Sequence, residues 1–267
     1  LDMRVSTLPG VHGESIVLRI LDRSDTSVDL AQLGMPKNVL THYQRIINLP
    51  HGMVLITGPT GSGKTTTLYA TLEKINSERQ KIITVEDPVE YQLEGITQIQ
   101  ANASIGLNFA TGLRSIVRQD PDVLMVGEIR DHETAEISIE SALTGHLVFS
   151  TLHTNDAAGA VTRLQDMGVE GYLISSSLLA IQAQRLVRRV CTDCSELVDI
   201  NQDEASVLGI EVEDCPKIRR GFGCERCGNA GYKGRVGLYE LLLMSDAIRH
   251  HIANDADATV IRDEAIA

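Results

Sequence analysis

Residues 58–65 read Gly58-Pro59-Thr60-Gly61-Ser62-Gly63-Lys64-Thr65, and this stretch decides the fold of the 267-residue chain. Its spacing is G-x-x-x-x-G-K-[ST], in which glycines let the backbone wrap around phosphate oxygens with N–H groups pointing inward. An apolar run, residues 53–57, precedes the stretch, and a segment with a helical pattern, residues 65–76, follows it. Strand, glycine-rich loop and helix in this order predict a phosphate-binding loop for a nucleotide.

Each part of the loop has an expected task. We expect Lys64 to reach the β- and γ-phosphates of ATP and the Thr65 hydroxyl to hold Mg²⁺. The positive end of the following helix dipole adds to phosphate binding. The residues expected to bind ATP are Gly58, Pro59, Thr60, Gly61, Ser62, Gly63, Lys64, Thr65 and Thr66.

Short apolar runs alternate with helical segments on both sides of the loop. The runs cover residues 53–57, 81–85, 123–126 and 147–151, and residues 157–167 carry apolar side chains on one helical face. Unbroken apolar runs of this length are typical of strands buried on both faces of a largely parallel sheet. We therefore predict an α/β nucleotide-binding core over residues 30–189, with polar clusters at the carboxyl ends of its strands.

The segments before and after this core have different patterns. Two β-prone runs flank a turn-rich stretch and predict a hairpin over residues 1–22. A polar linker over residues 23–29 follows it. Because a lone hairpin is barely stable in water, we expect it to be the end of a preceding domain, and the chain to be a fragment of a longer protein. Residues 236–267 are expected to form a C-terminal helical segment that includes a helix over residues 259–267.

Four of the five cysteines form two Cys-x-x-Cys pairs. They are Cys191, Cys194, Cys224 and Cys227. Two such pairs supply the four thiolates of a tetrahedral Zn²⁺ site, and a closed set of four sulfurs leaves no position for water, so the zinc would be structural. Residues 190–235 are poor in apolar side chains, so we expect the metal to stabilise a small subdomain there. The fifth cysteine, Cys215, is off the pattern and is not expected to be a ligand.

The formal net charge is −12, and the chain has three Phe, six Tyr and no Trp. A DNA-translocating ATPase with a zinc module would carry a basic excess and stacking aromatic side chains, so we expect no nucleic-acid partner. One basic run, residues 185–189, is interpreted either as a local patch or as the cationic end of a helix. No apolar run is long enough to cross a bilayer, so any membrane association is expected to come through a partner.

A P-loop ATPase also needs groups that hold Mg²⁺ and activate the attacking water. The usual aspartate after four apolar residues is absent, because Val123–Val126 is followed by Gly127 and Glu128. Glu86 and His153 closely follow two other predicted strands. Either glutamate can serve as the catalytic base, and the sequence leaves the choice open.

Together these motifs resemble the secretion ATPases of type II secretion and type IV pilus assembly, over nearly the whole chain. The matching segments are the phosphate-binding loop as Walker A, residues 83–91 as the family's aspartate box, residues 127–131 as its atypical Walker B, and residues 143–156 as its histidine box. The resemblance implies a RecA-like core with a small tetracysteine zinc-binding subdomain. The hairpin resembles the end of the family's second N-terminal domain, which fits a C-terminal motor fragment.

The resemblance also implies roles for individual side chains. Glu86 and Glu128 would activate water or organise Mg²⁺, and His153, with His146 as a second candidate, would sense the γ-phosphate. Arg4 and Arg19 would reach the phosphates when the domains close in a hexamer. Other arginines that the family places around the subunit boundary are Arg114, Arg118, Arg130 and Arg235.

By the same resemblance, the chain would be an ATP-hydrolysing motor that powers pseudopilus assembly and protein export in type II secretion. The tetracysteine element favours type II secretion over pilus retraction as the process that the motor powers. Type IV pilus assembly with the same chemistry is one alternative, and a nucleotide-gated scaffold without useful turnover is another. The implied partners are a homo-hexamer and the cytoplasmic domains of inner-membrane platform proteins, which the region before residue 1 would contact. The expected location is the cytoplasm, with peripheral attachment to the inner membrane.

Overall fold

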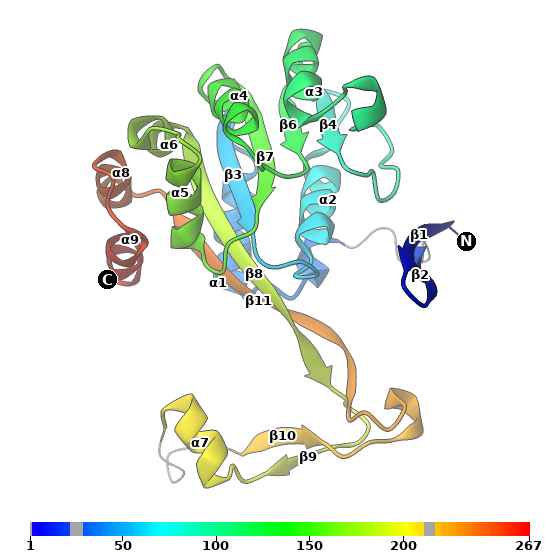
Figure 1. Cartoon of the computed structure of the whole chain (residues 1–267). Helices are drawn as coiled ribbons and strands as arrows, with labels where there is room; N and C mark the ends of the chain where they lie inside the picture. The colour runs from blue at the N-terminus through cyan, green and yellow to red at the C-terminus, as the bar shows by residue number, and fades with distance from the viewer. Residues whose placement is uncertain (1, 22–28, 211–216) are drawn as a thin grey trace. The chain divides into compact units, whose positions relative to one another are not determined.

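The computed structural model describes residues 2–21, 29–210 and 217–267 (Figure 1). The described strands are β1 Asp2–Gly10, β2 Gly13–Leu21, β3 Gly52–Thr57, β4 Ile82–Glu86, β5 Thr97–Gln100, β6 Val123–Val126, β7 Leu147–Leu152, β8 Leu178–Val190, β9 Ser195–Val198, β10 Ile218–Gly221 and β11 Tyr232–Leu243. The described α-helices are α1 Lys37–Ile46, α2 Lys64–Ile75, α3 Phe109–Ile116, α4 His132–Leu143, α5 Ala157–Asp166, α6 Gly171–Ser177, α7 Gln202–Leu208, α8 Asp246–Ala253 and α9 Ala258–Ile266.

A seven-stranded sheet in the order β11-β8-β3-β7-β6-β4-β5 forms the centre of the core. The pairs β8–β3, β3–β7, β7–β6, β6–β4 and β4–β5 are all parallel, as the unbroken apolar runs predict. Every residue of β3, β4, β6 and β7 is buried. The prediction of an α/β fold around a largely parallel sheet is therefore confirmed.

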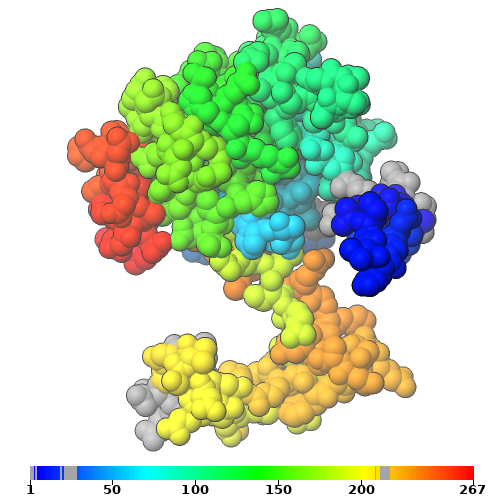
Figure 2. Space-filling view, viewed as in Figure 1, coloured from blue at the N-terminus to red at the C-terminus, as the bar shows by residue number. Residues whose placement is uncertain are grey.

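Two layers of helices cover the two faces of the sheet (Figure 1). In β3, Met53 and Leu55 pack into the hydrophobic cluster that contains side chains of α3–α6, α8 and α9. Val54 and Ile56 pack into the other cluster, with side chains of α1 and α2. The alternation follows from the two-residue period of a strand. Figure 2 shows α8 and α9 packed closely on the α5–α6 side of the core.

The parallel arrangement brings several polar segments to one edge of the sheet. β3, β4, β6 and β7 all end there, because the carboxyl ends of parallel strands meet at the same edge. The phosphate-binding loop follows β3, Glu86 ends β4, and Glu128 and His153 come just after β6 and β7. This edge is therefore where a nucleotide site is expected.

The chain divides into two compact units, and each is described by itself. One comprises Leu1–Gln184 and Tyr239–Ala267, and the other is Arg185–Leu238. The second unit contains the antiparallel pair β9–β10 and helix α7. Its bounds lie within β8 and β11, a few residues outside the predicted subdomain 190–235.

Two local predictions in this part of the chain are wrong. The basic run 185–189 belongs to strand β8, so it is not the end of a helix. Residues 236–243 belong to strand β11, and the predicted C-terminal helical segment begins only with α8. Residues 185–190 of β8 and the first five residues of β11 are largely exposed. No alternation of buried and exposed side chains therefore marks these segments as strands.

The N-terminal segment pairs β1 with β2 as an antiparallel hairpin, in which Arg4 lies opposite Arg19. Its exposed apolar side chains include Val5, Leu8, Ile16 and Leu18. That this hairpin ends a larger domain stays a prediction. Among the described residues, no helix has both the length and the apolar character that a membrane crossing requires.

Candidate nucleotide site and candidate metal centre

The phosphate-binding loop joins the buried end of β3 to the start of α2. A side chain at Gly58 would place its Cβ 2.4 Å from the carbonyl oxygen of Gln184, so only glycine allows the loop to approach β8 this closely. Gly63 precedes α2 with φ 90°, in the left-handed region that glycine adopts without strain. The first N–H groups of α2 have no carbonyl partner within the helix, and so they can bind an anion.

The Lys64 ammonium lies over the loop. Its Nζ donates hydrogen bonds to the carbonyl oxygens of Gly58 at 2.8 Å and Pro59 at 3.2 Å. Burial lowers the pKa of Lys64, and the nearby Glu128 partly opposes this shift. Its acceptors in the loop are neutral carbonyls, so no directly bonded carboxylate has to be displaced when a phosphate binds.

Other groups of the loop also fit a bound anion. The buried Ser62 hydroxyl has no hydrogen-bond partner in the described part of the chain. Thr65 and Thr66 are exposed on the first turn of α2, where a hydroxyl can bind a cation or a phosphate oxygen. Pro59, Thr60 and Gly61 form the exposed rim of the loop.

Gln184, a residue that the sequence did not single out, fixes the loop to β8. Its Nε2 donates to the carbonyl oxygen of Ser62 at 2.9 Å, and its Oε1 accepts from Thr67 Oγ1 at 3.0 Å. The Gln182 amide donates to the same Oε1 at 3.1 Å. A buried amide with satisfied donor and acceptor groups holds both loop and helix in place.

Glu128 and His153 form a row with Lys64. His153 Nδ1 lies 3.5 Å from Lys64 Nζ, and His153 Nε2 lies 3.3 Å from Glu128 Oε2. The other Glu128 oxygen accepts a hydrogen bond from Arg130. Burial acts to raise the pKa of Glu128, but Arg130 and His153 together lower it below its usual value. The side chain remains 17% exposed at the sheet edge.

Glu86 has a different environment, although its strand is next to β6. The residue is only 3% exposed. Oε1 accepts from Thr84 Oγ1 at 2.5 Å and from Gln98 Nε2 at 3.1 Å, and Oε2 accepts from the Tyr69 hydroxyl. Tyr69 and Gln98 were not predicted, because no motif marks a contact between α2, β4 and β5.

The remaining predicted residues lie elsewhere. His146 precedes β7, at the opposite end of that strand from His153, and its Nδ1 is 2.9 Å from the Ser141 carbonyl oxygen. Arg114 pairs with Glu133 on the surface. The side chains of Arg4 and Arg19, and all of Cys215, are outside the described part of the structure. Arg118 belongs to the short 3-10 helix Val117–Gln119, and Arg235 belongs to β11.

The four predicted zinc ligands come together in the second unit. The sulfurs of Cys191, Cys194, Cys224 and Cys227 all lie within 4.8 Å of one another. The recorded distances are 3.9 Å for Cys191–Cys224, 3.8 Å for Cys194–Cys227 and 3.7 Å for Cys224–Cys227. Tetrahedral zinc with bonds of about 2.3 Å separates its sulfurs by about 3.8 Å, so the residues fit the metal.

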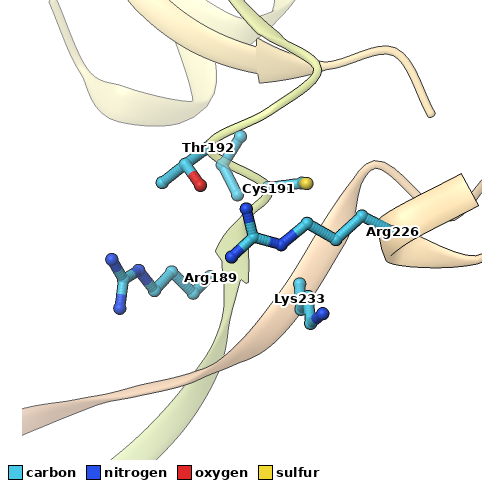
Figure 3. A pocket seen from close by; sticks show the side chains of 6 residues that line it. Arg189, Cys191, Thr192, Arg226 and Lys233 are labelled. Atoms are coloured by element: carbon cyan, nitrogen blue, oxygen red, sulfur yellow. The ribbon is translucent and has the colours of Figure 1, made fainter. Parts of the chain in front are cut away.

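Backbone N–H groups and cationic side chains lie near the cysteines. The N–H groups of Gly223 and Gly231 donate to Cys194 Sγ and Cys227 Sγ, both at 3.3 Å. Arg189, Arg226 and Lys233 line a cavity of about 190 Å³ beside Cys191 (Figure 3). Four thiolates carry more negative charge than one Zn²⁺ cancels, so these cations would offset the excess when the metal is bound.

Comparison with known proteins agrees with the motifs. A model of the type II/IV secretion system protein family matches residues 1–266. The chain belongs to this family. It is 52% identical over 255 residues to the type II secretion system ATPase E of Vibrio cholerae, covering 96% of this chain and 51% of that protein. It is 53% identical over 251 residues to the type II secretion system protein E of Aeromonas hydrophila, covering 94% of this chain and 50% of that protein.

Solved structures show the same fold. The pilus retraction motor PilT with bound ADP matches with a TM-score of 0.67 and 28% identity, over 99% of this chain and 66% of that one. The ATPase DotB of Legionella pneumophila matches with a TM-score of 0.66 and 25% identity, over 98% of this chain and 62% of that one. The chain spans about half the length of the curated relatives that it matches. The predicted family resemblance is therefore confirmed.

Proposed function

We propose that this chain is the ATP-hydrolysing motor part of a type II secretion ATPase, which powers pseudopilus assembly and protein export. The observation that carries the proposal is the row Lys64–His153–Glu128 at the carboxyl edge of the sheet, beside a loop built to bind phosphates. The relatives, named type II secretion system ATPase E and protein E, support type II secretion over the alternative of type IV pilus assembly.

The proposed reaction is in-line attack of water on the γ-phosphorus of ATP. The bond from that phosphorus to the bridging oxygen breaks, and ADP and phosphate leave. Lys64 stabilises the negative charge on the phosphate oxygens. Thr65 and Glu128 are the groups that would hold Mg²⁺, which neutralises phosphate charge when bound. His153 lies between Lys64 and Glu128, where it can respond to a γ-phosphate.

The two glutamates differ in the groups that bond their carboxylates. Glu128 is bonded to Arg130 and its pKa is lowered, so it binds a proton weakly and suits a cation-organising role. Glu86 accepts hydrogen bonds from three neutral groups. Since a carboxylate offers about four acceptor sites, one site is left for the proton of the attacking water. We assign Glu86 as the base.

The test of the function is phosphate release from Mg-ATP. Lys64→Ala should lower the rate by more than about a hundredfold, because a transition-state charge loses its cation. Lys74→Ala is the matched control, since Lys74 is an exposed lysine of the same helix. If Lys64→Ala hydrolyses ATP at a rate within about tenfold of the wild type, the assignment of this loop as the site of ATP hydrolysis is wrong. If the wild type binds nucleotide without turnover, the chain is instead a nucleotide-gated scaffold.

The proposal extends to assembly and location. We propose a homo-hexamer in which Arg4 and Arg19, opposite each other in the hairpin, supply cations to the phosphates. The protein would contact inner-membrane platform proteins from the cytoplasm. Specific activity should then rise with protein concentration, and Arg19→Ala should abolish the rise with little loss of ATP affinity. Activity independent of concentration would contradict the hexamer.

The second unit is proposed to hold one structural Zn²⁺ through Cys191, Cys194, Cys224 and Cys227. The spacing of the four sulfurs, close to that of tetrahedral zinc, supports this assignment. Arg226 donates to both carboxylate oxygens of Asp193, at 2.6 and 2.7 Å, and this pair joins the segments that carry the two Cys-x-x-Cys motifs.

A further inference from the structure

Three hydrogen-bond donors from three elements converge on Glu86. Tyr69 comes from α2, Thr84 from β4 itself and Gln98 from β5. They occupy both carboxylate oxygens of a residue that is almost completely buried. Because both carboxylate oxygens accept hydrogen bonds, this donor cage fixes the orientation of the Glu86 side chain.

The direction of the Tyr69 hydroxyl is fixed by its other partners. The hydroxyl oxygen lies 3.2 Å from the Glu90 backbone nitrogen, which donates to it, and 3.4 Å from Gln98 Nε2. A hydroxyl has a single proton, and both of these neighbours are donors, so that proton points to Glu86. Tyr69 therefore acts as a donor to Glu86 and not as an acceptor.

The cage also connects Glu86 to the phosphate-binding helix. Tyr69 is completely buried on α2, the helix that begins with Lys64. Gln98 holds the segment after β4, because its side chain also bonds the Leu93 N–H at 2.7 Å and the Tyr91 carbonyl oxygen at 3.2 Å. The Tyr91 ring packs edge-on against Tyr69 with centroids 4.6 Å apart. The carboxylate is thus fixed to the element that carries the phosphate-binding lysine.

We propose that Tyr69 is a positioning residue for the Glu86 base, with Gln98 as its partner, and that the two keep the carboxylate aligned with the phosphate-binding helix. The inference rests on the proposed function and deepens it. A merely structural tyrosine would fill space and satisfy its own hydroxyl. Tyr69 instead directs its proton to the catalytic carboxylate.

The groups recorded beside Glu86 in the described part of the chain are neutral or acidic. Tyr69 and Tyr91 lie closest, Glu90 is near the Tyr69 hydroxyl, and Glu73 is near Tyr91. No cation among the described residues forms a recorded ion pair with Glu86. The three recorded hydrogen bonds therefore hold the carboxylate, and removal of one donor should move it.

The experiment compares Tyr69→Phe with Tyr43→Phe. Tyr43 is also completely buried, and its hydroxyl pairs with Thr71 of the same helix at 2.8 Å, with no recorded contact to Glu86. Tyr69→Phe should lower kcat by about ten- to hundredfold, the value of a hydrogen bond to a charged group, with KM within about threefold. Tyr43→Phe should change neither kcat nor KM.

A second measurement separates this inference from the proposed function and from misfolding. The ¹³C signal of the Glu86 carboxyl, assigned by its loss in Glu86→Gln, is recorded at one pH in the wild type and both variants. Its chemical shift should change in Tyr69→Phe alone, because one carboxylate oxygen loses a hydrogen-bond donor. Equal chemical shifts, or an unchanged kcat, overturn the inference. If the wild type hydrolyses no ATP, the proposed function fails, and the carboxyl signal alone decides whether the cage holds Glu86.

Discussion

The nucleotide-binding core and the cysteine-bearing unit differ in what stabilises them. In the core, whole strands are buried and two hydrophobic clusters fill both faces of the sheet. In Arg185–Leu238, the buried apolar residues among those described are Cys191, Ile200 and Ala205. A unit with so few buried side chains gains little from the hydrophobic effect. The comparison indicates that the core folds through apolar burial and that the smaller unit needs another source of stability, which the proposed zinc would supply.

Removal of the metal should have the largest effect and should be confined to the smaller unit. Structural zinc contributes about 10 kcal/mol or more to the folding of small domains. Cys224→Ser should therefore lose zinc, measured by elemental analysis, and the amide protons of residues 185–238 should lose their protection from exchange. Nucleotide affinity should stay within about twofold of the wild type, because the loop lies in the separate core.

Cys215→Ser is the matched control for this prediction. The substitution is chemically the same, but Cys215 lies off the spacing of the other four and outside the described residues. It should keep one Zn²⁺ per chain and the full exchange protection. If metal-free wild-type protein keeps full exchange protection over residues 185–238, the smaller unit is not stabilised by a metal.

The converse change is a cavity in the core. Phe149 in β7 is completely buried in the cluster that α1 and α2 cover. Phe149→Ala should lower the free energy of unfolding of the core by about 3–5 kcal/mol, measured by urea denaturation. Zinc content should not change. Leu197→Ala, which truncates an exposed side chain of the smaller unit, is the control and should change neither quantity.

The sequence predicted the parts of the site that depend on local spacing. The phosphate-binding loop and the four cysteines are recognisable because a few consecutive residues suffice for their geometry. Gln184 was missed, since it contacts Ser62 across 122 residues and no pattern marks such a pair. Tyr69 and Gln98 were missed for the same reason. The choice between Glu86 and Glu128 was also beyond the sequence, because it depends on burial and on partners from other strands.

The smallest expected effect concerns a helix cap on the surface of the core. The Asp257 carboxylate accepts hydrogen bonds from the N–H groups of Val260 and Thr259 at the start of α9, and these bonds lower its pKa from 3.8. Because the pKa of Asp257 is lower in the folded state, the stabilisation is complete at pH values above the pKa of the unfolded state. It is lost as the pH falls through the pKa of the folded state. Asp257→Ala should lower the Tm of the core by about 2–4 °C at pH 7. This difference should shrink as the pH falls below 3.8.

Asp257→Ser keeps a capping oxygen without the charge, so its Tm at pH 7 should stay near that of the wild type and should add no pH dependence. A drop in zinc content would show that the cap does not act on the core alone. A difference in Tm between the wild type and Asp257→Ala that persists in acid would show that the cap does not act through its charge.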